Sequence, residues 1–241
     1  MLDLLPGDVP ALAPDLLGFG SAFHGPVALE DVTAEAHARR LLDATDGPLV
    51  VAGYDVGSRV AQAMARLEPQ RIAGLVVTPA FPAMLRYSTA PEMAQHYWYQ
   101  HFHRLPLSEQ LLDGDLDAVR AYLGHFWHHW AGDRDILQPD QLDDLARVYA
   151  RPGAFASSIA WYRAGAGATS QPAVPESPPL TLPVIALCST RDPLFAAGWT
   201  DRIDLDFADV DLRVLDDVGH FVPLEAPDAV TDAIRELANR P

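Results

Sequence analysis

Short apolar runs alternate with helix-patterned segments along this chain, and this alternation limits the fold more than any other feature of the sequence. Continuous apolar runs are typical of strands that are covered on both faces of a parallel sheet. Strands are predicted over Val9–Ala13, Leu49–Ala52, Ile72–Val77, Val184–Leu187 and Leu212–Leu215. Helices are predicted over Glu30–Ala44, Arg59–Leu67 and Asp228–Leu237. Because strands joined by helices indicate crossover units, we expect an α/β fold with a mostly parallel sheet.

The middle of the chain differs in composition from both ends. Residues 81–180 are rich in aromatic residues and histidine, and helical periodicity predicts helices over Pro91–Phe102, Leu116–Trp130 and Gln138–Tyr149. Asp115 or Asp140 could cap two of these helices. A proline-rich return linker is indicated by Pro172, Pro175, Pro178, Pro179 and Pro183. We therefore expect residues 1–80 and 181–241 to form one core, and residues 81–180 to form a helical cap over a pocket.

The charge balance argues against two classes of partner. The 241 residues include 17 Lys and Arg against 33 Asp and Glu, which gives a formal net charge of −16. A surface that acidic repels phosphate backbones and anionic lipid, so we expect no nucleic-acid and no membrane partner. The single cysteine, Cys188, excludes a disulfide framework and a zinc site with several thiolates. Residues 1–10 hold no basic residue ahead of an apolar stretch, so we expect no signal peptide and a cytoplasmic protein.

A tight strand-to-helix connection carries the strongest chemical signal. The predicted strand Leu49–Ala52 enters the next helix through Gly53, Asp55 and Gly57, with a candidate nucleophile between two small residues. We expect both glycines to be required, because side chains there would clash in so tight a turn. A carboxylate presented in this way can attack carbon and form an alkyl ester. The alternative is an aspartate that only caps the helix, and the same Asp-x-Gly pattern recurs at Asp217-Val218-Gly219.

Two residues that follow later strands could complete a hydrolytic site. His220 lies between the last predicted strand and the last helix, at the carboxyl edge where a parallel sheet presents its chemistry. Asp192 follows the preceding strand and is a candidate to orient the imidazole, since the turn Thr78-Pro79-Ala80 offers no carboxylate. Either residue alone could be an ordinary turn or packing residue. Together with Asp55 they give the chain order of the α/β hydrolases.

Core and cap together resemble the soluble epoxide hydrolases of the α/β-hydrolase fold, in the aspartate-nucleophile branch related to the haloalkane and haloacetate dehalogenases. The resemblance covers nearly the whole chain and rests on the core motif 14–20 and on cap segments 98–105, 125–130 and 161–164. It implies that Asp55 opens an epoxide and that His220, oriented by Asp192, activates the water that releases the ester. It also implies that no metal and no organic cofactor takes part.

The resemblance assigns further roles within the cap. It implies that Tyr99 and Tyr162 point at the nucleophile and hold the epoxide oxygen, with Tyr97 as the competing residue for the first position. A phenol with a pKa of about 10 stays protonated at neutral pH and can hydrogen-bond to the oxygen as negative charge develops. The aromatic residues expected to surround a small apolar epoxide-type substrate are Trp98, Phe102 and Trp161.

The beginning of the chain departs from the family pattern. No His-Gly-x-Pro loop precedes Pro14, and only residues 1–13 stand before it, so we expect a core that lacks the first strands. In the family that loop supplies one oxyanion donor, which leaves the backbone N–H of Val56 for this role. A sheet without those strands exposes an edge, and a homodimer that covers it is the hypothesis that follows.

Three alternatives stay open. The same residues could cleave a carbon–halogen bond, and Arg59 corresponds to an arginine that holds a carboxylate in the related fluoroacetate dehalogenases. Val56 stands where the family often has tryptophan, which argues against a haloalkane dehalogenase. A shortened chain could also be a non-catalytic member of the fold. Finally, imidazoles at helical spacing could bind a metal, although no further residues complete a ligand set; these are His125, His128 and His129.

Overall fold

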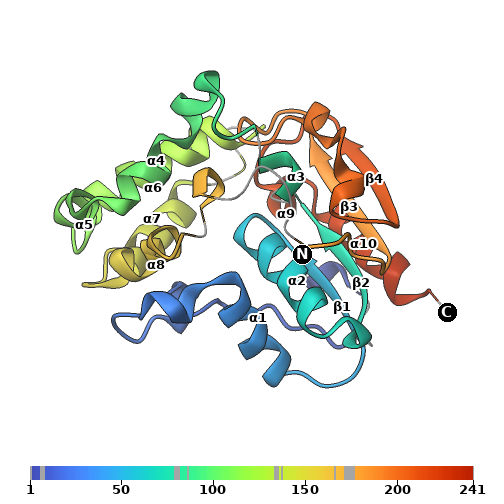
Figure 1. Cartoon of the computed structure of the whole chain (residues 1–241). Coiled ribbons are helices and arrows are strands. Elements are labelled where there is room, and N and C mark those ends of the chain that lie inside the picture. The colour runs from blue at the N-terminus through green and yellow to red at the C-terminus, as the bar shows by residue number, and fades with distance from the viewer. Residues whose placement is uncertain are drawn as a thin grey trace.

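A computed structural model shows the chain as a sheet with flanking helices and a helical cap (Figure 1). It describes residues 2–5, 9–78, 82–85, 87–132, 136, 138–165, 167–170 and 177–240. Within these residues the sheet has four parallel strands in the order β1-β2-β3-β4. They are β1 (Leu49–Gly53), β2 (Ile72–Val77), β3 (Val184–Ser189) and β4 (Val210–Leu215). The predicted α/β fold with a parallel sheet is confirmed.

Both faces of the central strands β2 and β3 are covered, as continuous apolar strands require. Successive side chains of a strand point to opposite faces, so Leu75 packs into the cluster that contains α1 and α2. Its neighbour Val76 packs on the other face, in the cluster that contains Leu237 of α10. The core helices are α1 (Ala34–Asp43), α2 (Val56–Leu67), α9 (Val222–Glu225) and α10 (Pro227–Ala238).

The cap consists of helices inserted between β2 and β3, and it lies on one side of the core in Figure 1. After the short α3 (Pro82–Leu85), its helices are α4 (Ala94–Arg104), α5 (Pro106–Leu112), α6 (Leu116–Trp130), α7 (Pro139–Tyr149) and α8 (Ala154–Arg163). Val119 of α6, Ala146 of α7 and Ile159 of α8 share a small core of their own. The bounds predicted for α6 are confirmed, and the Asp115 carboxylate caps this helix by accepting from the backbone N–H of Ala118 at 2.9 Å.

The strand predicted over Val9–Ala13 is wrong. This segment has no ladder partner among the described residues, and most of it is exposed. Pro10 removes one ladder donor within the segment, and Pro14 directly after it removes the next, which disfavours pairing as a strand.

Several helix starts also differ from prediction: α2 begins at Val56 rather than Arg59, and α4 begins at Ala94 rather than Pro91. The helix expected over Glu30–Ala44 begins at Ala34, because the Thr33 hydroxyl caps it there by accepting from the N–H of Ala36 at 3.1 Å. Asp140 lies inside α7 rather than capping it, since Gln138 holds the N-cap position. Part of the predicted linker lies outside the described residues, namely Pro172 and Pro175.

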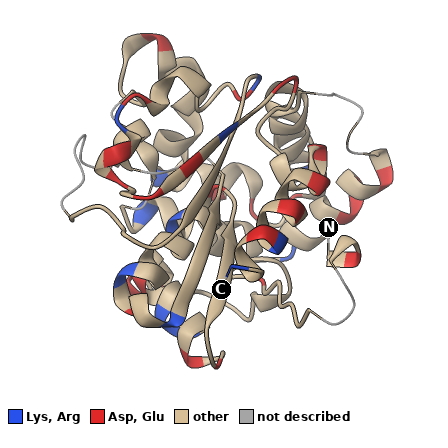
Figure 2. Ribbon diagram, turned by 90° about the vertical axis from the view of Figure 1, so that its right-hand side faces the viewer, with Lys and Arg blue, Asp and Glu red and all other residues tan. Residues whose placement is uncertain are grey.

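Acidic side chains are spread over both the core and the cap, as Figure 2 shows. This distribution agrees with the formal net charge of −16. In the part of the chain that the structure describes, every helix is too short or too polar to cross a membrane.

Candidate active site

Asp55 stands at the sharp turn between β1 and α2. Its backbone has φ 48° and ψ −113°, a conformation that residues other than glycine rarely adopt, and its side chain makes no capping bond to α2. The turn needs Gly53, because a methyl group there would overlap the carbonyl oxygen of Gly57. A methyl group on Gly57 would meet open space. The expectation that both glycines are required is therefore wrong for Gly57.

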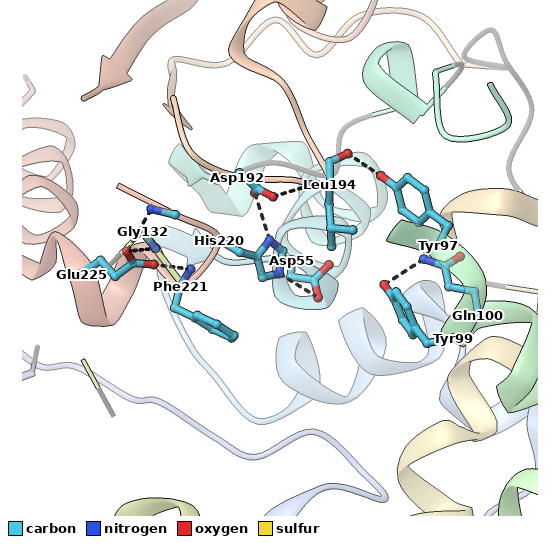
Figure 3. Close-up of polar contacts among 11 residues, drawn as sticks. Asp55, Tyr97, Tyr99, Gln100, Gly132, Asp192, Leu194, His220, Phe221 and Glu225 are labelled. Atoms are coloured by element: carbon cyan, nitrogen blue, oxygen red, sulfur yellow. Dashed lines mark hydrogen bonds and ion pairs between the residues drawn. The ribbon is translucent and has the colours of Figure 1, made fainter. Parts of the chain in front are cut away.

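The carboxyl ends of β1, β3 and β4 bring Asp55, Asp192 and His220 together, as Figure 3 shows. His220 Nδ1 lies 2.9 Å from Asp192 Oδ2, and His220 Nε2 lies 3.7 Å from Asp55 Oδ2. The other Asp192 oxygen accepts the backbone N–H of Leu194 at 2.8 Å, which fixes this carboxylate. Asp192 and His220 are buried, whereas the Asp55 side chain is 33% exposed. The carboxylate that a substrate can reach is thus the one at the turn.

The two carboxylates decide the charge of His220. Burial opposes the charged imidazole, but Asp192 and Asp55 outweigh it and raise the pKa of His220 to about 10. The imidazole is therefore protonated at neutral pH. Converting Asp55 into a neutral ester would remove one negative charge, lower the pKa of His220 and allow it to act as a base.

This arrangement predicts a pH-dependent contribution to stability. A histidine whose pKa rises from 6.5 to about 10 on folding stabilises the protein fully below pH 6.5 and loses that contribution as the pH rises towards 10. Its expected size is on the order of a few kcal/mol. Urea unfolding measured from pH 6 to 10 gives the free energy of unfolding of the parent and of His220→Gln. The difference between these two free energies should become smaller as the pH rises. If the two free energies of unfolding changed with pH in the same way, the raised pKa of His220 would be contradicted.

Tyr99 of α4 and Tyr162 of α8 both line the space beside Asp55. Their ring centroids are 5.7 Å apart and the rings are nearly perpendicular. Burial raises the pKa of each phenol well above its ordinary value, so both keep their protons. Tyr97 points elsewhere, since its hydroxyl donates to the carbonyl oxygen of Leu194 at 2.5 Å. The geometry favours Tyr99 over Tyr97 as the first cap tyrosine of the site.

A cavity of about 330 Å³ connects Asp55 and His220 with the cap. Aromatic residues that line it include Phe19, Tyr54, Tyr122, Phe126, Trp127, Trp130, Phe155 and Phe221. Trp98 and Phe102 are not among the described lining residues, so their predicted pocket role is not supported. They share one face of α4, whereas Tyr99 and His103 share the neighbouring face that meets the cavity. Trp98 instead stacks on Phe126 and is 38% exposed.

A second, narrow pocket of about 20 Å³ opens beside Asp55, with room for roughly one water molecule. It is also lined by Val56, Arg59, Gln100 and Trp161. Val56 is the first residue of α2, whose backbone N–H has no acceptor within the helix and can face an oxyanion on Asp55. Burial lowers the pKa of Arg59 to about 10, so it is charged at neutral pH, and its guanidinium lies 5.5 Å from the Trp161 ring centroid.

The end of α6 is tied to the loop that carries His220. Glu225 accepts the backbone N–H groups of Gly132 and Gly219 at 2.7 and 2.9 Å (Figure 3). The backbone N–H of His220 donates to the carbonyl oxygen of Trp130 at 2.8 Å. A methyl group on Gly219 would overlap the backbone nitrogen of Gly132. We call Trp130, Gly132, Gly219 and Glu225 the cap clamp; the sequence analysis identified none of these contacts.

Two of the three histidines considered as metal ligands, His125 and His129, contact each other. The rings of His125 and His129 are 4.0 Å apart, and His129 Nδ1 lies 2.7 Å from the carbonyl oxygen of His125. In the described part of the chain, no three His, Cys, Asp or Glu side chains gather as metal ligands would.

Comparison with known proteins supports the fold. The sequence model described as "Alpha/beta hydrolase family" matches residues 1–233. The chain is 27% identical to a fluoroacetate dehalogenase of Burkholderia sp. over 172 residues, which cover 67% of this chain and 56% of that protein. It is 22% identical to a soluble epoxide hydrolase of Corynebacterium sp. (strain C12) over 231 residues, which cover 92% of this chain and 78% of that protein.

A solved structure of an epoxide hydrolase from Bacillus megaterium superposes with a TM-score of 0.74. The sequence identity is 15%, and the match covers 94% of this chain and 82% of that chain. Likeness at this identity shows the fold alone. The match to the dehalogenase spans little more than half of that protein's length.

Proposed function

Because the chain belongs to the alpha/beta hydrolase family, we propose that it opens epoxides to vicinal diols through a covalent ester on Asp55. The observation that carries the proposal is that two phenols, Tyr99 and Tyr162, line the same pocket as this carboxylate. A carboxylate can attack carbon, and protonated phenols can assist an oxygen that leaves from it. The sequence similarity to the soluble epoxide hydrolase of Corynebacterium sp. supports the same chemistry.

The first half-reaction forms the ester. Asp55 attacks one epoxide carbon while the bond from that carbon to the ring oxygen breaks, and the electron pair stays on the oxygen. The cap phenols hydrogen-bond to this oxygen, and one of them transfers its proton to it. The products are a hydroxyalkyl ester on Asp55 and a phenolate in the cap.

The second half-reaction releases the diol. With Asp55 neutralised, His220 gives up its proton, which restores the phenol through solvent. Neutral His220 then takes a proton from water, and the resulting hydroxide attacks the ester carbonyl. The backbone N–H of Val56 stabilises the oxyanion. Collapse breaks the bond from the acyl carbon to the diol oxygen, and the hydroxyl proton of the adduct passes to that oxygen, which leaves the Asp55 carboxylate and the free diol. His220 is again protonated, so no external proton is consumed.

A carbon–halogen hydrolase is the second candidate. It is favoured by the similarity to a fluoroacetate dehalogenase and by Arg59, which lines the narrow pocket with Asp55 and could pair with a substrate carboxylate. Halide ions leave with the help of N–H donors and do not need a proton. The paired phenols beside Asp55 therefore support epoxide opening more strongly.

The proposal is tested by intact-mass spectrometry of His220→Gln after exposure to an aryl epoxide and, separately, to a haloalkane and a haloacetate. Without the base, ester hydrolysis should slow by about 10³-fold, so the ester accumulates. We expect a mass increase equal to the whole epoxide, and none in Asp55→Asn.

The other outcomes discriminate between the alternatives. An adduct only from a halogenated substrate would replace epoxide opening by carbon–halogen cleavage. No adduct from any of the substrates would favour a non-catalytic member of the fold.

A further inference from the structure

The hydroxyl of Tyr99 receives a hydrogen bond from a buried amide that the reaction above does not use. Gln100 is 3% exposed, and its Nε2 donates to Tyr99 Oη at 3.0 Å. On its other side, Gln100 Oε1 accepts the backbone N–H of Thr169 at 3.1 Å and the Thr169 hydroxyl at 3.3 Å. The amide therefore joins α4 to the segment that follows α8, beside the narrow pocket at Asp55.

Thr169 fixes which way the Gln100 amide faces. A backbone N–H can only donate, so the amide atom that it meets is the oxygen, and the amide nitrogen must face Tyr99. An amide nitrogen donates and does not accept, so Tyr99 Oη is the acceptor in this contact. The position is tightly enclosed, since a methyl group on Gly167 would lie 2.7 Å from Gln100 Oε1.

The two phenols are consequently not equivalent. Burial raises the pKa of both, and the hydrogen bond between them lowers the pKa of Tyr99 while it raises that of Tyr162. Tyr99 Oη accepts from Gln100 (Figure 3), so its own hydrogen can donate within the pocket that Tyr99 shares with Asp55.

We propose that Gln100 is a positioning residue that makes Tyr99 the proton donor of the pair. The inference rests on the proposed epoxide opening. As the bond from Asp55 to carbon forms and the ring carbon–oxygen bond breaks, the proton moves from Tyr99 Oη to the epoxide oxygen. The negative charge left on Tyr99 is stabilised by the Gln100 N–H, which is already in place before the reaction.

The test is Gln100→Met, which keeps a side chain of similar length and removes the donor. We expect the rate constant for ester formation, measured by rapid mixing with an aryl epoxide, to fall about 10- to 100-fold, as for loss of a hydrogen bond to a charged group. The rate constant for ester hydrolysis should stay within about twofold of the parent, because His220 and Asp192 are untouched.

A double-mutant cycle separates this role from packing. The fall in the rate constant for ester formation caused by Gln100→Met should disappear in a Tyr99→Phe background, because Gln100 acts through the Tyr99 hydroxyl. The same fall should persist in a Tyr162→Phe background. Equal losses in both half-reactions, or an undiminished effect in Tyr99→Phe, would overturn the proposal.

Gln62→Met is the matched control, since Gln62 is another buried amide, 5% exposed, that donates to the Ser58 carbonyl oxygen within α2. It should leave ester formation unchanged. A second readout is independent of activity: in protein labelled with [4-¹³C]tyrosine, the Tyr99 Cζ resonance, assigned with Tyr99→Phe, should move in Gln100→Met and not in Gln62→Met. An unmoved resonance would refute the Gln100 contact, whereas a shifted resonance in a protein that opens no epoxide would refute only the proposed function.

Discussion

Replacing both Tyr99 and Tyr162 with phenylalanine is expected to lower the rate of epoxide opening by about 10³-fold or more, near the upper range for loss of a general acid. The departing alkoxide would then develop its charge in a cavity lined mainly by aromatic rings, where an unpaired charge is costly. Rapid mixing of the double variant with an aryl epoxide measures this step directly through the rate of ester formation.

Two controls give this prediction its specificity. Tyr97→Phe removes a phenol of the same helix whose hydroxyl is bonded to Leu194 O, so it should leave ester formation within about twofold of the parent. Any carbon–halogen cleavage should be largely spared in the Tyr99/Tyr162 double variant, because a halide needs no proton. If both substrate classes slowed equally, the phenols would only shape the pocket.

Gly53→Ala is expected to destabilise the fold by about 3 kcal/mol or more, the range seen when a core is overpacked against fixed backbone. The added methyl group would overlap the carbonyl oxygen of Gly57 and lie 2.7 Å from the Ser58 Cα, and neither atom can move without unwinding the start of α2. Urea unfolding followed by circular dichroism measures the loss.

Gly57→Ala is the matched control within the same turn. Its new methyl group meets open space, and an alanine inside α2 should stabilise the helix by about 0.5–1 kcal/mol relative to glycine. Equal destabilisation by both variants would mean that the turn is tight on both sides of Asp55, as the sequence pattern alone predicts.

Most of the sheet could be predicted from sequence because β1, β2 and β3 are nearly continuous apolar runs, whereas β4 includes Asp211 and Arg213. Ile72–Val77 was predicted with the bounds of β2, and α6 was predicted with its observed bounds. The positions of Asp55, Asp192 and His220 followed from the same topology, since residues after parallel strands converge at one edge of the sheet. The order of these elements along the chain predicts that the three residues meet at this edge, whereas the distances of 2.9 and 3.7 Å come from the structure alone.

What the sequence analysis missed depends on contacts between distant segments. Trp98 is expected in the pocket, but Trp98 and its neighbour Tyr99 lie on different faces of α4. Which of the two faces meets the cavity depends on how α4 is rotated about its axis. Only the packing of α4 against α6 and α8 fixes that rotation. A glutamine beside a tyrosine carries no signal until Thr169 orients it. Helical spacing in α6 could have indicated the cavity lining, because Tyr122, Phe126 and Trp130 recur every four residues.

The cap clamp bears on attempts to change substrate range by transplanting a cap from a relative. A graft that ends with α6 would place foreign residues opposite Gly219 and Glu225 of the host. The backbone of residues 130–132 lies directly against Gly219, so a backbone of different shape at the end of α6 would clash there. Glu225 also needs a backbone N–H at position 132, which a proline would not provide. A chimera that folds should therefore carry residues 217–225 together with the cap. The residues that line the pocket and the segment that holds His220 would then be transferred as one unit.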